Sequence, residues 1–176
     1  SMTTIILLNG PPRSGKDMAA TFIRKDIGAD KCTDMKMSQP LKDCFYKLFA
    51  FEDIQGWTML EKTKDEPNEH LHGLTPRQFQ IQLSEDFCKP RFGQEFFGEV
   101  FARRINQSAA SYVTVSDVGF DRELAPIIKA FGRDSLFCIQ LEREGTSFEN
   151  DSRGYIDYRN LGIQGCRIAN NHDLEM

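Results

Sequence analysis

The sequence LNGPPRSGKD, residues 8–17, follows the apolar run Ile5–Leu8 and precedes a stretch with helical periodicity. Gly10, Gly15 and Lys16 match the spacing G-x-x-x-x-G-K, and Asp17 stands where Ser or Thr is usual. A glycine-rich turn between a strand and a helix gathers backbone N–H groups and the positive end of the helix dipole around a small cavity. The stretch therefore predicts a phosphate-binding loop.

Each part of this loop has an expected role. The two glycines let the backbone bend and approach a ligand closely, and Lys16 would reach the terminal phosphates of a nucleotide. The residues expected to surround the phosphates are Gly10, Pro11, Pro12, Arg13, Ser14, Gly15, Lys16, Asp17 and Met18. The alternative is a glycine-rich turn that binds nothing.

Beyond the loop, apolar runs alternate with helical patterns, which is typical of an α/β protein with a mainly parallel sheet. Strands are expected at 4–8, 111–117, 136–143 and 165–170, with a weak strand within 31–37. Helices are expected at 17–28, 38–49, 75–89, 94–109 and 121–132. We expect one domain over 1–176 with a three-layer P-loop NTPase fold, a helical acceptor-side insert at about 51–110 and a lid-like segment at 143–160.

Local signals mark where several of these helices begin and end. Gly28 and Gly132 are expected to end their helices, and Ser38 is a candidate N-cap. Thr75, Pro76 and Gln78 form the pattern of a capping box with proline in the first turn. In the first helix, the expected apolar face consists of Met18, Ala19, Phe22 and Ile23.

Composition excludes several classes of protein. The chain has 176 residues, of which 40% are hydrophobic and 27% charged, as in ordinary globular proteins. It has no apolar run long enough to span a membrane. Its five cysteines show no C-x-x-C spacing, so we expect reduced thiols, no cysteine zinc site and a cytoplasmic location. The net charge of −4 gives no general affinity for nucleic acid.

Two aspartates are candidate ligands of Mg²⁺. Ser116 and Asp117 end the strand expected at 111–117, and the carboxyl ends of parallel strands line the crevice where open α/β sheets bind ligands. There Asp117 would hold Mg²⁺ or orient an acceptor hydroxyl; alternatively it caps the next helix. Asp17 could be a second acidic Mg²⁺ contact or a favourable charge in the first turn of its helix.

Phosphoryl transfer also needs cationic groups around the transferring phosphate. The candidates are Arg13, Arg77, Arg91, Arg103, Arg104, Arg143, Arg153 and Arg159, although each alone could be a solvated surface charge. The polar segment that contains Arg143, Arg153 and Arg159 lies between two expected strands, as a mobile lid would. In the polar stretch 51–73, Trp57 could stack on a base. His70 and His72 could bind a metal ion as a pair but are expected to lie in a solvated loop.

These features together resemble the deoxynucleoside monophosphate kinases of tailed bacteriophages, in the adenylate-kinase-like branch of phosphate-loop kinases. The similar stretches are RSGKDMAATFI (13–23), SQPLKDCF (38–45), PRQFQIQLSEDFCKPRFGQEFF (76–97), YVTVSDVGFDRELAPIIKAFG (112–132) and CRIANNHDLEM (166–176). The first includes the family's unusual aspartate after the lysine. One departure is Gly119, which stands where the family often has an arginine two residues after the strand-ending aspartate.

The resemblance implies a kinase that uses ATP and Mg²⁺, in the host cytoplasm if the chain is phage-encoded. Lys16, Asp17, Asp117, Arg77, Arg143 and Arg153 would be its catalytic residues, with Asp17 and Asp117 at the metal. The expected acceptor is a deoxynucleoside monophosphate. The alternatives are a 5-hydroxymethylpyrimidine base in phage DNA, which a site opened by Gly119 could suit, and a nucleotide-binding module without transfer activity. No membrane partner is expected, and the sequence is compatible with a homodimer.

Overall fold

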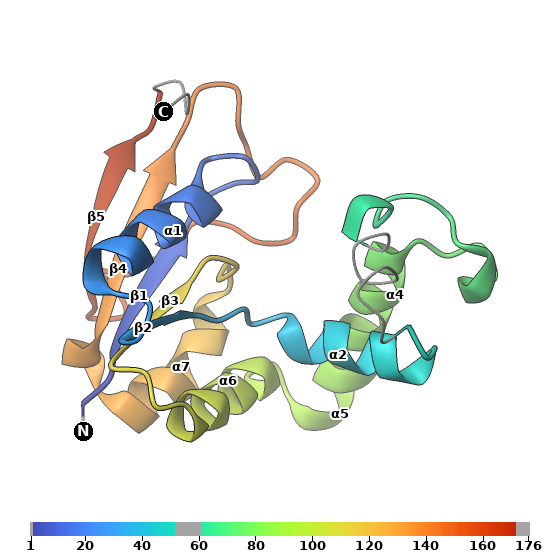
Figure 1. Ribbon diagram of the computed structural model, residues 1–176, viewed down its shortest axis with the longest axis horizontal. Helices are drawn as coiled ribbons and strands as arrows, with labels where there is room; N and C mark the ends of the chain where they lie inside the picture. Colours follow the sequence, from blue (N-terminus) through green and yellow to red (C-terminus); the bar gives the residue numbers. More distant parts are fainter. Residues whose placement is uncertain (1, 52–60, 172–176) are drawn as a thin grey trace. The chain divides into compact units, whose positions relative to one another are not determined.

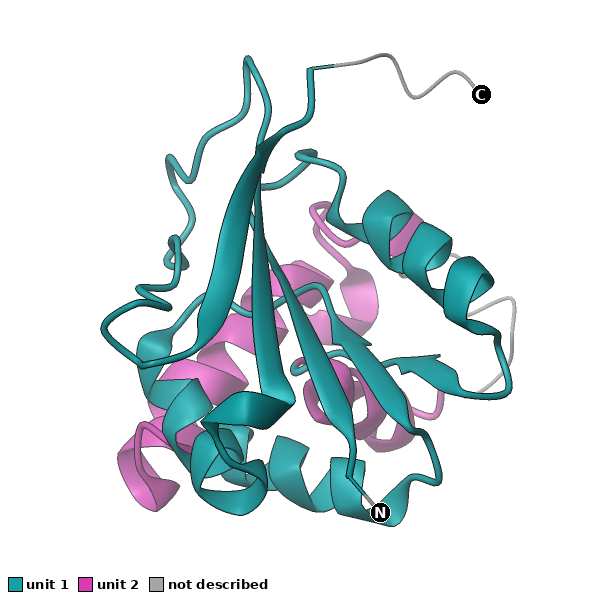
Figure 2. Cartoon of the chain, turned by 90° about the vertical axis from the view of Figure 1, so that its left-hand side faces the viewer, with its two compact units in different colours: residues 1–37, 97–176 teal, residues 38–96 magenta. Residues whose placement is uncertain are grey.

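The computed structural model describes residues 2–51 and 61–171, and these form two compact units. One unit combines Ser1–Met37 with Phe97–Met176, and the other is Ser38–Phe96 (Figure 2). The sequence predicted an insert at about 51–110, whereas the second unit begins before the helix Gln39–Leu48. That helix belongs to the second unit because its aromatic side chains pack on residues later in the same unit.

The first unit is built on a five-stranded parallel sheet in the order β2-β3-β1-β4-β5 (Figure 1). Its strands are β1 (Thr4–Asn9), β2 (Cys32–Asp34), β3 (Tyr112–Val115), β4 (Leu136–Glu142) and β5 (Gln164–Ala169). The predicted α/β class with a parallel sheet is therefore confirmed. β1 lies in the middle of the sheet, so the loop that follows it opens at the centre of the sheet's carboxyl edge.

Three helices accompany this sheet: α1 (Lys16–Ile27), α6 (Phe96–Gln107) and α7 (Asp121–Phe131). The connections β1–α1–β2 and β3–α7–β4 run in opposite directions along the sheet. Because such crossovers are right-handed, α1 and α7 cover opposite faces and the unit has three layers. A short 3₁₀ turn, η3 (Arg133–Ser135), leads into β4. The core comprises Ile5, Leu7, Leu8, Phe101, Ile105, Val113, Val115, Leu124 and Ile127, all buried.

Glycines end α1 and α7 as predicted. Gly28 has φ 115° and donates its N–H to the Arg24 carbonyl, and Gly132 has φ 84° and donates to Ile128. The prediction for the apolar face of α1 was wrong for Met18 and Phe22, which are exposed, whereas Ala19 and Ile23 are half-buried. Ala20 is the buried residue of that helix. A residue as small as alanine lets the helix backbone approach the sheet, and this turns the larger side chains outward.

The second unit is helical. It contains α2 (Gln39–Leu48), η1 (Glu69–Leu71), α4 (Pro76–Gln82), the π-helix η2 (Leu83–Cys88) and α5 (Lys89–Phe92). Its core is aromatic: Phe45, Tyr46 and Leu71 are buried, and Phe49, Phe51, Leu74 and Phe79 pack against them. Trp57 lies outside the described residues.

Local signals in this unit have mixed outcomes. The capping box at Thr75 and Gln78 is present with both of its hydrogen bonds, whereas Ser38 occupies the N-cap position of α2 without a capping side-chain bond. The helix predicted at 75–89 continues to Phe92, and its π segment ends at Cys88, two residues before Pro90. Proline removes one backbone donor and clashes with the carbonyl four residues earlier, so a wider turn before it is expected.

Candidate phosphate-binding site

The loop between β1 and α1 has the strand–turn–helix geometry that the sequence pattern requires. Arg13 and Gly15 both have positive φ, 67° and 103°, and α1 begins at Lys16 immediately after Gly15. Within the loop, the Ser14 N–H donates to the Pro11 carbonyl over 3.2 Å. The positive φ at position 15 explains the need for glycine there, because other residues rarely adopt it.

Lys16 folds back over this loop. Its Nζ donates to the carbonyl oxygens of Gly10, at 2.5 Å, and Pro11, at 3.1 Å. Burial lowers the pKa of Lys16, and the nearby positive charge of Arg153 lowers it further. The Ser14 hydroxyl is fully buried and has no hydrogen-bond partner among the described residues. The loop thus contains a partly dehydrated ammonium group and an unused hydroxyl, both of which an anionic ligand could satisfy.

Asn170, just after β5, holds the loop from a distant part of the sequence. Its side-chain amide donates to the Ser14 carbonyl over 2.9 Å, and a Cβ on Gly15 would meet the same amide. Asn170 is itself tied to β4, because its N–H donates to the Glu142 carbonyl at 2.7 Å. Sequence analysis included this asparagine only within the similar stretch 166–176 and predicted no role for it.

Asp17 lies at the start of α1 in a small network of charges. Its Oδ1 accepts hydrogen bonds from Lys36 Nζ at 2.7 Å and from the Ser116 hydroxyl at 3.0 Å. Lys36 also donates to the Ser116 oxygen and lies 3.8 Å from Asp34 Oδ2. The hydrogen bond from Lys36 holds the pKa of Asp17 below its usual value. Sequence analysis predicted no role for Lys36 or Ser116.

Asp117 follows β3, at the carboxyl edge of the sheet. Its Oδ1 accepts a hydrogen bond from the Met37 N–H at 2.8 Å. The alternative that Asp117 caps the next helix is wrong, because α7 begins at Asp121 with Phe120 at its N-cap. Asp117 lies beside Ser116, whose hydroxyl reaches Asp17, so the two candidate metal ligands border the same edge of the sheet.

Arg153 occupies the space above Gly119. A Cβ on Gly119 would lie 2.6 Å from Cγ and 2.9 Å from Cδ of Arg153, and the Gly154 N–H donates to the Gly119 carbonyl. The expectation that Gly119 leaves an open site is therefore wrong. The missing β-carbon at Gly119 makes room for an arginine that comes from a different part of the chain.

The Arg153 guanidinium forms a fork with Asp151. Its Nε and Nη2 donate to the two carboxylate oxygens at 3.0 and 2.8 Å. This contact lowers the pKa of Asp151 and raises the pKa of Arg153, which also senses the negative charge of Asp117. The positive charge of Arg153 in turn lowers the pKa of Lys16. Arg153 therefore lies within electrostatic reach of both Lys16 and Asp117.

Asn9, the last residue of β1, joins the loop to the segment that carries Arg153. Its amide donates to the carbonyls of Val118 and Gly154, each at 3.1 Å. Its Oδ1 accepts from Gln140 Nε2 at 3.0 Å and from the Ile156 N–H at 2.7 Å. The buried side chain of Asn9, the residue before the candidate phosphate loop, thus bonds both the turn after β3 and the residue after Arg153.

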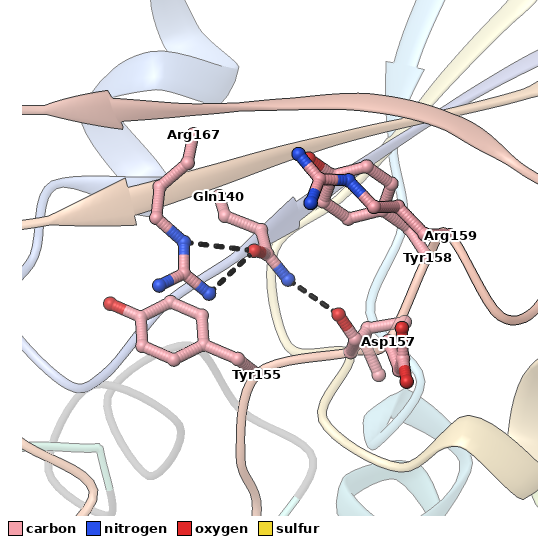
Figure 3. A pocket seen from close by; sticks show the side chains of 7 residues that line it. Gln140, Tyr155, Asp157, Tyr158, Arg159 and Arg167 are labelled. Atoms are coloured by element: carbon pink, nitrogen blue, oxygen red, sulfur yellow. Dashed lines mark hydrogen bonds between the residues drawn. The ribbon is translucent and has the colours of Figure 1, made fainter.

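The segment 143–160 contains no helix or strand, and its second half is anchored. The Tyr155 hydroxyl donates to the Leu141 carbonyl at 2.9 Å, and Ile156 is buried. Between this segment and the sheet lies a cavity of about 500 Å³ (Figure 3). Arg167 crosses one side of it, 4.1 Å from the Tyr155 ring, with its guanidinium bonded to Gln140.

The remaining candidate arginines have other surroundings. Arg77 belongs to the second unit and pairs there with Asp65, with its Nε 2.6 Å from Oδ1. Arg159 stacks on Tyr158 at the cavity beside β4 and β5. Arg143 Nη1 is buried without a partner in the described part of the chain, and Arg13 is exposed. Arg91 and Arg103 are exposed, and Arg104 donates to the Lys36 carbonyl. Among the candidate arginines, Arg153 is the one whose charge lowers the pKa of Lys16.

The donor set suits a metal that is shared with phosphate oxygens. Among the described residues, no group of three acidic, cysteine or histidine side chains could hold an ion alone. Mg²⁺ at phosphoryl-transfer sites takes one or two carboxylates and completes its shell with phosphates and water. Asp17, 86% exposed, and Asp117 fit that requirement.

No protein-family model and no curated protein sequence matches the chain. Among solved structures, the chain is similar to the crystal structure of TT1252 from Thermus thermophilus, with 12% identity, a TM-score of 0.48 and coverage of 99% of this chain and 92% of that one. No described helix is long and apolar enough to cross a membrane. At this level of likeness, function has to be inferred from the residues of the site itself.

Proposed function

We propose that this protein is an ATP-dependent phosphotransferase that moves the γ-phosphoryl group to a nucleotide-type acceptor. The observation that carries the proposal is the loop Gly10–Gly15 at the carboxyl edge of a parallel sheet, with Lys16 folded over it and Arg153 near enough to lower the pKa of Lys16. Backbone N–H groups, a lysine and an arginine around one such loop are the groups that phosphoryl transfer requires.

Each residue of the site would have a role in the transfer that suits its chemistry. Lys16 would leave the carbonyls of Gly10 and Pro11 for the β and γ phosphates, and Arg153 would place its fork on the charge that develops during transfer. Asp17 and Asp117 would hold Mg²⁺ or orient the acceptor hydroxyl. When bound, Mg²⁺ neutralises phosphate charge and aligns the reacting oxygens.

A free deoxynucleoside monophosphate is the preferred acceptor. The case for a base within DNA used the space expected above Gly119, and Arg153 fills that space. The net charge of −4 also disfavours a duplex, which binds mainly through its phosphates.

A labelled-ATP transfer screen tests the proposal. The full chain is incubated with Mg²⁺, [γ-³²P]ATP and either a panel of nucleoside monophosphates or DNA that contains 5-hydroxymethyluracil. We expect label on a deoxynucleoside monophosphate, and loss of that signal in Arg153→Ala but not in Arg122→Ala, an exposed arginine on α7. Label only on DNA would overturn the acceptor. ATP binding without transfer to any acceptor would indicate a nucleotide-binding module.

A further inference from the structure

Lys36 places a positive charge where a divalent metal ion would bind. Its Nζ lies 2.7 Å from Asp17 Oδ1, hydrogen-bonds to the Ser116 oxygen and is 3.8 Å from Asp34 Oδ2. Two carboxylates and a hydroxyl around one cation are oxygen ligands of the kind that Mg²⁺ prefers. The ammonium group therefore occupies an oxygen-lined cation position.

The position is built by three elements of the first unit. Asp34 ends β2, Ser116 follows β3, and Asp17 lies in the first turn of α1. The Arg104 guanidinium donates to the Lys36 carbonyl at 2.7 Å, and Asp34 Oδ1 accepts from the Thr114 hydroxyl at 2.8 Å. The lysine side chain is only 28% exposed. Both the lysine backbone and one of its acidic neighbours are thus fixed by contacts outside the cluster.

We propose that Lys36 is a built-in counter-cation of the phosphate-loop site and competes with a divalent metal ion for Asp17. The proposal rests on the proposed function in one respect, namely that Asp17 is a metal ligand. Asp17 stands where such loops usually carry a hydroxyl, and a full negative charge beside bound phosphates would be unfavourable without a cation. Lys36 supplies that cation when no metal is bound and must withdraw from Oδ1 when a metal takes it.

Metal binding in the absence of nucleotide tests this role. The probe is Mn²⁺, whose free concentration is read by electron paramagnetic resonance during titration of the full chain. We expect Lys36→Met to bind Mn²⁺ at least about tenfold more tightly than the unmodified chain, the scale on which a neighbouring like charge acts on an ionic site. Lys36→Arg, which keeps the charge, should stay near the unmodified affinity, and so should Lys31→Met, which removes an exposed lysine near the start of β2.

Further variants separate the outcomes. The gain in Lys36→Met should vanish when Asp17→Asn is added, because the competed ligand is then gone. Lys36→Gln repeats the test should the methionine variant fold poorly, as judged by circular dichroism. Unchanged or weaker Mn²⁺ binding in folded Lys36→Met and Lys36→Gln would overturn the proposal and leave Lys36 as a structural tie between β2, β3 and α1. The readout involves no acceptor, so failure of the transfer screen cannot be mistaken for failure here.

Discussion

At the scale of single residues, the site consists of charged groups that neutralise one another within the chain. Lys16 is bonded to loop carbonyls, Asp17 to Lys36, and Arg153 to Asp151. Under the proposed function, each of these contacts would be exchanged for a contact with phosphate or metal. Their rearrangement would therefore accompany ligand binding.

Lys16→Ala should abolish transfer and leave the fold intact. Its ammonium group would stabilise the charge on the transferring phosphate, and loss of one such group typically costs about 10²–10³-fold in kcat. Its bonds to Gly10 and Pro11 are made by a half-buried side chain, so the melting temperature should change little. Steady-state kinetics and thermal unfolding, with Lys129→Ala as an exposed-lysine control, measure both effects. Turnover near that of the unmodified chain would contradict the role of Lys16.

The Asp151–Arg153 fork should contribute to stability in a pH-dependent way. The fork lowers the pKa of Asp151 below its ordinary 3.8, so its contribution is present above that pH and is lost as pH falls through the folded-state value. Asp151→Asn should lower the free energy of unfolding by about 1–3 kcal/mol at pH 7, and this loss should shrink as the pH falls below 3.8. Urea unfolding across this range measures the difference.

The control for this experiment is the exposed pair Asp65–Arg77 in the second unit. Asp65→Asn should have little effect at any pH, because water screens an exposed ion pair. An effect of Asp151→Asn that does not depend on pH would show that the fork's charge is not what stabilises the fold.

At the scale of elements, the connection from β4 to β5 positions Arg153. This connection contains no helix, but it is bonded to the turn after β3 through Gly154 and Gly119, and to the end of β1 through Asn9. An arginine in an irregular segment is thereby held in one place. Loops fixed on a rigid sheet commonly carry functional residues for this reason.

Gly119→Ala should reduce transfer more than it reduces ATP binding. The added Cβ would lie 2.6 Å from Arg153 Cγ, so the arginine must shift, whereas the loop around Lys16 is not touched. We expect kcat to fall about tenfold or more with a dissociation constant for ATP within about twofold, since the arginine would act mainly in the transition state. Gly154→Ala is the matched control, because a Cβ there meets nothing within 4 Å. Equal kinetics for the two variants would contradict the role of the Gly119–Arg153 contact.

At the scale of the molecule, one buried side chain connects the central strand, its neighbour and the long connection. Asn9 is fully buried and makes four hydrogen bonds. Truncating it would leave buried amides and carbonyls without partners. Such groups lose their interactions with water and gain nothing in return.

Asn9→Ala should therefore destabilise the first unit strongly. We expect a loss of about 2–4 kcal/mol in the free energy of unfolding, the range for a broken buried hydrogen-bond network. Asn106→Ala, at an exposed position of α6, should be neutral or slightly stabilising because alanine has the higher helix propensity. Urea denaturation followed by circular dichroism measures both variants, and equal stabilities would exclude Asn9 as a structural centre.

The reactivity of the cysteine thiols should reflect how deeply each one is buried in the described core. Cys32 and Cys138 are fully buried, and burial raises the pKa of Cys138 to about 12, whereas Cys44 is exposed. With Ellman's reagent at pH 8, Cys44 should react first, and Cys32 and Cys138 should react only as the chain unfolds. Measuring the reaction with and without urea, with Cys44→Ser as the control, checks this order. Rapid reaction of Cys138 in the native protein would contradict the described core.

The sequence by itself determined the features that depend on near neighbours along the chain. The loop Gly10–Gly15, the helix ends at Gly28 and Gly132, and the capping box at Thr75 were all readable because backbone conformation there is decided within a few residues. The alternation of strands and helices likewise predicted a parallel α/β sheet. The inward face of α1 was misjudged, because which side packs depends on the sheet and not on the helix alone.

Only the tertiary structure decided which charged groups meet. Lys36 and Ser116 are 80 residues apart in sequence, and Asn170 and Ser14 are 156 apart, yet each pair is hydrogen-bonded. In the sequence Arg153 is one of several candidate arginines, and only the fold places its stem against Gly119. Parallel strands bring distant segments to one edge of the sheet, and no local pattern records which side chains arrive there together.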